Sequence, residues 1–320
     1  MAGRLRRPGA TRQPSARAPV PAAWSAQAPS GSAGLAQPAT SLAQWWQRFN
    51  DPQLTQLVTQ TLQSNTSLRS AQASLQQARA QVDVQSAGLL PSVGTSASAQ
   101  RSRASNNTGS SFQAGFDASW EPDVFGRLRS GVSASAADAQ AAEASLADVQ
   151  VSLAAETAVN YIELRGLQQR LAIARSNLAS QQETLQITQW RLQAGLTTSL
   201  VSEQARAAAE QTAAQIPALE SSLAQSRHSL AVLTGQAPLA LDGLLADSVA
   251  VPQPAQDLAL AIPAETLRQR PDVRAAEQRI AAALARVSQA DAARYPDFRI
   301  SGNLGLRALT VGALTNGSSI

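Results

Sequence analysis

The chain has 320 residues with a formal net charge of +4, only 4% aromatic residues and no cysteine, which excludes disulfides and thiolate metal sites. All 26 basic residues are arginines, and five of them lie in the first 17 residues, so the remainder carries 4 − 5 = −1. A nucleic-acid-binding surface is therefore not expected, because the basic excess is confined to one end.

Residues 1–41 are rich in Pro, Ala, Ser, Gly and Arg, show no hydrophobic periodicity, and are predicted to be disordered. Prolines interrupt residues 8–40, so no intact signal peptide is recognisable. No apolar run approaches the roughly 20 residues of a membrane helix. If the chain crosses a membrane, it must do so with strands.

Order is expected from the tryptophan pair Trp45-Trp46, followed by a short helix after Asp51-Pro52. A second amphipathic helix is predicted over residues 67–87, and a strand begins at Pro91. We therefore expect the first folded unit to begin at about residue 42.

Residues 111–121 alternate between apolar and polar side chains, which predicts a strand. A polar segment, residues 103–111, is expected to turn back to the strand after Pro91, giving a β-hairpin over about residues 90–122. Its size fits a membrane-barrel hairpin with the apolar side outward, although an ordinary soluble hairpin has the same alternation. The expected lipid-facing residues are Phe112, Ala114, Phe116, Ala118 and, on a later strand of the same pattern, Phe298, Ile300 and Leu304.

A long antiparallel helical hairpin is predicted over residues 127–234. Its first helix runs to Gly195, roughly 95 Å at 1.5 Å per residue. Ser199 is the expected N-cap of the returning helix, and Pro217 is expected to kink that helix. The seam of the first helix follows alternating steps of three and four: Leu164, Leu167, Leu171, Ala174, Leu178, Leu185 and Leu192.

Residues 65–98 and 270–303 are two copies of one pattern at an offset of 205 without a gap. The chain is thus predicted to be a duplicated α-β-β-α unit: a first repeat at 42–234, a proline-rich connection at 235–263, and the start of a second repeat at 264–320. By this reasoning, counterparts of residues 116–234 are expected after the last residue given. Recurrence of the strand in both copies favours the barrel over a soluble hairpin.

Five segments carry a family resemblance, in order: WWQRFNDPQL at 45–54, WEPDVFGR at 120–127, AGLTTSL at 194–200, LTGQAP at 233–238 and RPDVRAAE at 270–277. Together they resemble TolC-like outer-membrane factors, in particular the NodT-type efflux lipoproteins. On these residues the resemblance implies a mainly α protein that forms a homotrimer, with four strands per protomer in one 12-stranded β-barrel. It also implies location in the outer membrane of a Gram-negative bacterium, with helices extending into the periplasm.

The resemblance further implies a periplasmic adaptor and an inner-membrane RND-type pump as partners, no cofactor, and export of drugs, metals or other toxic solutes. The family's N-terminal acylated cysteine is absent from this sequence, and Val201 stands where relatives often carry an acidic residue. The implied sites are a periplasmic tip at Arg191, Gly195, Leu196, Thr197 and Ser199, and a barrel–helix junction at Trp120, Asp123, Phe125 and Gly126.

Two other function classes compete with this interpretation. The only histidine, His228, lies beside Arg227 without an evident carboxylate pair, so an enzyme is not expected. A periplasmic coiled-coil adaptor would share the long helical hairpin, but the repeated helix-to-strand pattern argues against it. The outer-membrane component of a type I secretion system is a further alternative within the resemblance.

Overall fold

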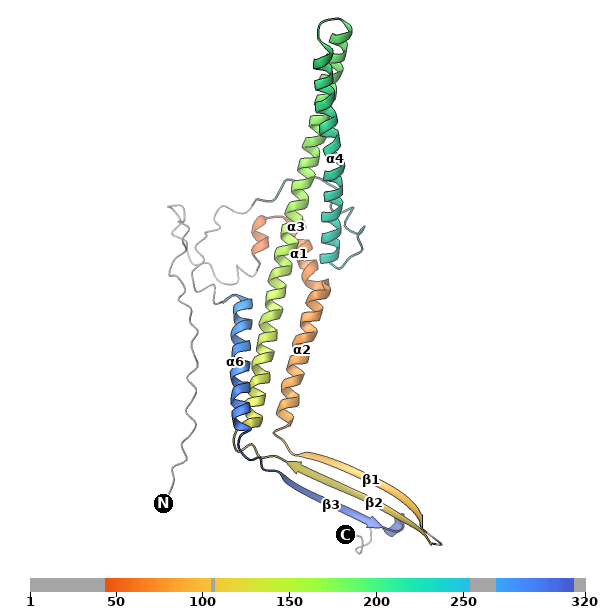
Figure 1. The fold of residues 1–320 in the computed structure, drawn as a ribbon, viewed down its shortest axis with the longest axis vertical. Helices are drawn as coiled ribbons and strands as arrows, with labels where there is room; N and C mark the ends of the chain where they lie inside the picture. The colour runs from red at the N-terminus through yellow and green to blue at the C-terminus, as the bar shows by residue number, and fades with distance from the viewer. Residues whose placement is uncertain (1–43, 105–106, 254–268, 314–320) are drawn as a thin grey trace, which may run out of the picture.

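The computed structural model describes residues 44–104, 107–253 and 269–313, and the elements form a long helical rod with a sheet at one end (Figure 1). The predicted disordered segment 1–41, the tip of the hairpin turn, and parts of the proline-rich connection and of the second repeat lie outside the described residues. The elements are η2 (Trp45–Phe49), α1 (Pro52–Ser64), α2 (Thr66–Ala87), β1 (Ser92–Ala104), β2 (Asn107–Trp120), α3 (Arg127–Gln193), α4 (Ser199–Leu233), α6 (Pro271–Ala292), β3 (Ile300–Ala308) and η3 (Val311–Ala313).

Helix α3 is the spine of the molecule. Its 67 residues give a length of roughly 100 Å, and α4 runs back along its C-terminal half while α2 and α6 flank its N-terminal half (Figure 1). The main apolar cluster lies where α1, α3 and α4 meet, with Leu54, Leu57, Tyr161, Leu164 and Leu230 fully buried. Within the described ranges, no helix is apolar enough over sufficient length to cross a membrane.

The packing of α3 against α4 confirms the predicted coiled coil. Beyond Leu171, the less exposed residues of α3 recur in steps of three and four as far as Leu192, and they include the polar Gln181 and Thr188. Pro217 lies inside α4 without dividing it. The matching seam of α4 consists of Ser202, Ala205, Ala209, Thr212, Ile216, Leu219, Leu223, Ser226, Leu230 and Leu233.

Helices α2 and α6 are the two repeat copies, and they contact α3 with different faces. Leu75 of α2 is 8% exposed, whereas its counterpart in α6, Ile280, is 53% exposed. Helix α6 instead buries Ala275 and Ala282, and the base of α3 is lined with small residues that permit this close approach. Those buried small residues are Gly131, Ala134, Ala137, Ala141 and Ala144.

One asparagine joins the end of α4 to the start of α2. The side-chain oxygen of Asn65 accepts from the backbone amides of Ser67 (2.8 Å) and Leu68 (3.4 Å), so it caps α2. Its side-chain nitrogen donates to the backbone carbonyl of Leu233 (2.9 Å) at the end of α4. Because α4 ends with Gly235 at φ 67°, its backbone passes close to the backbone oxygen of Ser64, where a Cβ would stand 2.9 Å away. The two helices thus abut and together follow α3.

A fully buried arginine ties the segment after α4 to the spine. The Arg165 guanidinium donates to Gln168 Oε1 (2.7 Å), to the backbone oxygen of Asp247 (2.6 Å) and to Gln53 Oε1, and it lies 5.0 Å from the centroid of the Tyr161 ring. Burial raises the pKa of Tyr161 to about 12. Arg165 therefore gives three acceptors the hydrogen bonds that water would otherwise provide, and it holds residues 241–247 on the rod.

The strands form one antiparallel sheet in the order β1-β2-β3. The predicted hairpin is confirmed, but the predicted turn at residues 103–111 is wrong, because β1 continues to Ala104 and β2 starts at Asn107. Asn107, Gly109, Ser110 and Ser111 are of types common in turns, yet pairing with β1 satisfies their backbone groups and keeps them extended. The last strand also begins later than predicted, at Ile300, so Phe298 precedes it.

Candidate functional site: the helical tip and the strand–helix junction

Gly195 ends α3 and turns the chain toward α4. Its φ is 71°, its amide donates to Leu192 O (3.0 Å), and the Leu196 amide donates to Arg191 O (2.8 Å). This pair of bonds is the Schellman arrangement, which satisfies carbonyls that the helix end leaves free. The predicted role of Gly195 at the helix end is confirmed by these bonds.

The start of α4 corrects one prediction. Thr198 takes the N-cap position with an extended backbone and no side-chain cap, while Ser199 is the first helical residue. The tip exposes large apolar side chains, since Leu196 is 76% exposed, Trp190 59% and Leu200 64%. Arg191 is the charged residue of the turn, and it is exposed. Trp190 and Leu200 lie off the seam of the coiled coil, and this offset is the sequence signal that could have identified them.

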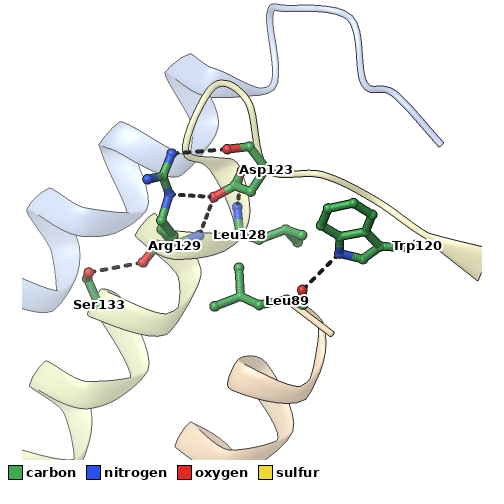
Figure 2. Close-up of polar contacts among 6 residues, drawn as sticks. All are labelled: Leu89, Trp120, Asp123, Leu128, Arg129 and Ser133. Atoms are coloured by element: carbon green, nitrogen blue, oxygen red, sulfur yellow. Dashed lines mark hydrogen bonds and ion pairs between the residues drawn. The ribbon is translucent and has the colours of Figure 1, made fainter. Parts of the chain in front are cut away.

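Asp123 caps α3 where the chain passes from strand β2 into that helix (Figure 2). Its carboxylate accepts from the backbone amides of Leu128 (3.1 Å) and Arg129 (2.9 Å) and from Arg129 Nε (3.1 Å). The Arg129 guanidinium also donates to the Asp123 backbone oxygen (3.0 Å). Burial by itself raises the pKa of Asp123, but these hydrogen bonds and the Arg129 charge outweigh it and lower that pKa below its ordinary value.

Gly126, at φ 83°, occupies the N-cap position of α3 and makes the sharp change of direction possible. Because glycine has no side chain to cap the helix, Asp123 supplies that function from three residues earlier. Glu121 and Arg127 form an ion pair on either side of this bend. The predicted junction residues are thus brought together in one compact turn.

Aromatic residues link the strands to the helices at the same place. Trp120 Nε1 donates to the backbone oxygen of Leu89 (3.0 Å), which ties the end of β2 to the segment between α2 and β1 (Figure 2). The Phe125 ring stacks on Tyr295 at a centroid distance of 4.8 Å and on Phe298 at 6.5 Å. Phe298 therefore contacts the junction of the first repeat. The prediction that Phe298 belongs to the strand of the second repeat is wrong.

The register of the sheet places the remaining strand residues on common faces. Phe116 is paired with Thr95 on one side and with Leu304 on the other, and Trp120 is paired with Ile300. Directly paired residues share a face, so Phe112, Ala114, Phe116, Ala118, Ile300 and Leu304 lie on one side of the sheet. The opposite side carries Ser96, Gln113, Asp117, Ser119, Ser301, Asn303 and Arg307.

The described residues contain no gathering of three or more His, Asp or Glu that could hold a metal ion. His228 is an exposed residue of α4. The features that remain are geometric: a long coiled coil with a shaped tip, a sheet with one apolar and one polar face, and a rigid joint between them. This architecture defines the class of proteins that join a helical rod to a membrane-type sheet.

Comparison with known proteins identifies the family. Residues 57–236 and 262–320 match the family model described as outer membrane efflux protein, and the chain belongs to this family. It is 31% identical over 268 residues to Nodulation protein T of Rhizobium leguminosarum bv. viciae, covering 82% of this chain and 55% of that protein. It is 32% identical to the pyoverdine export outer membrane protein OpmQ of Pseudomonas putida, covering 91% of this chain and 63% of that protein.

Solved structures agree with this assignment. The outer-membrane channel OprN superposes with a TM-score of 0.79 and 38% identity, covering 87% of this chain and 64% of that one. The outer membrane protein VceC of Vibrio cholerae gives 0.77 and 27%, covering 87% of this chain and 68% of that one. The chain spans about half to two thirds of the length of the curated relatives that it matches.

Proposed function

We propose that this chain forms part of the outer-membrane exit channel of a tripartite efflux system. The observation that carries the proposal is the joint between a sheet with one apolar and one polar face and a helical rod of roughly 100 Å. The apolar face meets lipid and the polar face lines a water-filled passage, as in membrane barrels. The names of the relatives, an outer-membrane channel and a pyoverdine export outer membrane protein among them, support the same function.

The proposed assembly is a homotrimer. In the described sheet, β1 and β3 are the outer strands, and each has one edge without a partner strand. Open edges are not tolerated in a bilayer, because their backbone groups would lack hydrogen bonds. The fourth strand that the resemblance implies for each protomer, together with strands of neighbouring protomers, pairs with these edges and closes a barrel.

The tip is the proposed contact for the periplasmic adaptor, with an inner-membrane RND-type pump behind it. The turn presents Arg191, Leu196 and Thr197 at the end of the rod farthest from the sheet (Figure 1). Its exposed apolar surface suits a contact with the hairpin end of another coiled coil. The subunit itself acts as a passive conduit for drugs, metals or other toxic solutes, and opening at the tip involves untwisting of the coiled coil.

Cell fractionation tests the proposal. The channel hypothesis predicts recovery of the protein in the detergent-extracted outer membrane as an oligomer that dissociates on heating. Recovery as a soluble periplasmic monomer would contradict it and would favour the adaptor interpretation. A matched pair of variants then examines the tip: Leu196→Asp should abolish cross-linking to the adaptor, whereas Val232→Asp, equally exposed on α4 but distant from the tip, should not.

A further inference from the structure

Two arginines interrupt the apolar face of the sheet at its hairpin end. On β1 the residues of this face follow alternate positions from Val93 to Ala99, and Arg101 and Arg103 are the next two. The register places Arg101 opposite Ser110, two residue pairs beyond the pair of Ala99 and Phe112. Both arginines therefore belong to the same side of the sheet as the apolar residues.

The position of these arginines agrees with the dimensions of a membrane. The apolar face of β2 extends over the nine residues from Phe112 to Trp120. At about 3.4 Å per residue and a tilt of about 40°, this stretch covers roughly 21 Å along the membrane normal, close to the apolar band of about 25 Å in membrane barrels. Arg101 and Arg103 lie roughly 7 and 14 Å along the strand beyond Ala99, which corresponds to the headgroup region.

An arginine on a lipid-contacting face is costly at mid-membrane but not at the interface, where its long side chain can extend to the headgroups. The two ends of the apolar face differ in this respect. On this face, the end next to the helices carries Trp120 and no charged residue, whereas the hairpin end carries both arginines. The charge is therefore confined to the end of the sheet that points away from the rod (Figure 1).

Among the residues that the structure describes, neither arginine has an anionic partner. Both are exposed, and no carboxylate of a described residue lies within 4.0 Å of either guanidinium. The acidic residue of the sheet, Asp117, is on the opposite face. Two guanidinium groups on alternate residues of one strand can each form paired hydrogen bonds with a phosphate.

We propose that Arg101 and Arg103 bind the phosphate groups of the glycolipid in the outer leaflet of the outer membrane. The proposal rests on the proposed function, since that function directs the apolar face to lipid and the hairpin away from the periplasm. Charge complementarity and continuity with the lipid-facing surface argue for a lipid phosphate as the occupant. The outer leaflet is the source because the arginines lie at the end of the sheet farthest from the helices.

Reconstitution of the full chain from detergent tests this site. The vesicles are phosphatidylcholine alone or with 10 mol% of diphosphoryl lipid A, the same glycolipid without phosphates, or phosphatidylglycerol at equal charge. Flotation measures the partition coefficient of the protein. General attraction of an arginine to an anionic surface contributes about a fivefold change in partitioning, so R101Q/R103Q should reduce the gain from phosphatidylglycerol by up to about 25-fold. Because hydrogen bonds to the phosphate add to this attraction, the same variant should reduce the gain from phosphorylated lipid A by more than that.

Two controls keep the test specific. Arg307 lies on the opposite face of the sheet, so R307Q changes the charge without changing the proposed site and should retain the gain. R101K/R103K keeps the charge but loses the paired guanidinium hydrogen bonds, so its gain should fall between those of R101Q/R103Q and the original chain, which excludes a folding defect as the cause. Equal partitioning of R101Q/R103Q and the original chain, or an equal arginine-dependent gain with phosphatidylglycerol, would overturn the inference. Failure of the chain to enter any of the vesicles would overturn the proposed function and this inference with it.

Discussion

Asn65 offers the sharpest test of how the rod is held together. Replacement by alanine removes two functions at once, the cap of α2 and the bond to the last carbonyl of α4. Loss of an N-cap costs about 1 kcal/mol, and a buried carbonyl without its donor costs about 1–3 kcal/mol. Asn65 is only 6% exposed, so water cannot readily replace the missing groups. The expected total is roughly 2–4 kcal/mol, or a decrease in Tm of about 6–12 °C for a cost near 3 kcal/mol.

Asn65→Ser separates the two functions. Serine is as good an N-cap as asparagine, but its hydroxyl is too short to cap α2 and also reach Leu233 O, so about half of the destabilisation should remain. Thermal unfolding followed by circular dichroism in detergent measures the change, and hydrogen exchange of residues 231–236 localises it. If Asn65→Ala lowers Tm by less than 2 °C, or Asn65→Ser behaves like Asn65→Ala, the description of this joint is incorrect.

Three further predictions concern the turn, the buried arginine and the junction. Gly195→Val should raise the hydrogen-exchange rate of the amides of residues 194–196 about tenfold, since a left-handed φ costs a non-glycine residue roughly 1–2 kcal/mol. The rate for Gly195→Asn should lie between those of the original chain and Gly195→Val. An unchanged rate in Gly195→Val would contradict the Schellman assignment. Arg165→Met should destabilise the protein by about 3 kcal/mol and speed proteolysis within residues 241–247, because three acceptors lose a donor. Unaltered cleavage would contradict the role of Arg165 in holding this segment on the rod. The folded pKa of Asp123 lies below its ordinary 3.8, so its stabilisation is complete above that pH and is lost as the pH falls through the folded pKa. The difference in Tm between the original chain and Asp123→Asn should therefore shrink below about pH 4, and a constant difference down to pH 2 would contradict this cause.

Periodicity predicted most of the secondary structure correctly. The seam of α3 and the hairpin at Gly195 follow from local spacing, and the helix at Pro271 was expected from the repeat at an offset of 205. Local composition predicted the wrong backbone conformation where pairing with another strand determines it. Residues 103–111 have turn-forming side chains, but most of them form strand, because the ladder between β1 and β2 extends through them.

The contacts that organise the molecule could not be predicted from spacing. Asn65 and Leu233 are 168 residues apart, and Arg165 and Asp247 are 82 apart. A polar residue within an apolar helix, such as Arg165, has the same local pattern whether it faces solvent or a buried carbonyl. The stacking of Phe298 on Phe125 likewise depends on how α6 packs along α3, which no local signal indicates.

In the proposed channel, one face of the sheet meets lipid and the other meets water. The most direct measurement compares Ala97→Cys with Ser98→Cys, neighbours on β1 that lie on opposite faces in a chain without native cysteine. Intact cells are treated with a water-soluble, membrane-impermeant maleimide. Labelling is expected at position 98, and position 97 should stay protected until SDS dissolves the membrane and unfolds the protein. Equal labelling of both positions, or protection of position 98 alone, would contradict it.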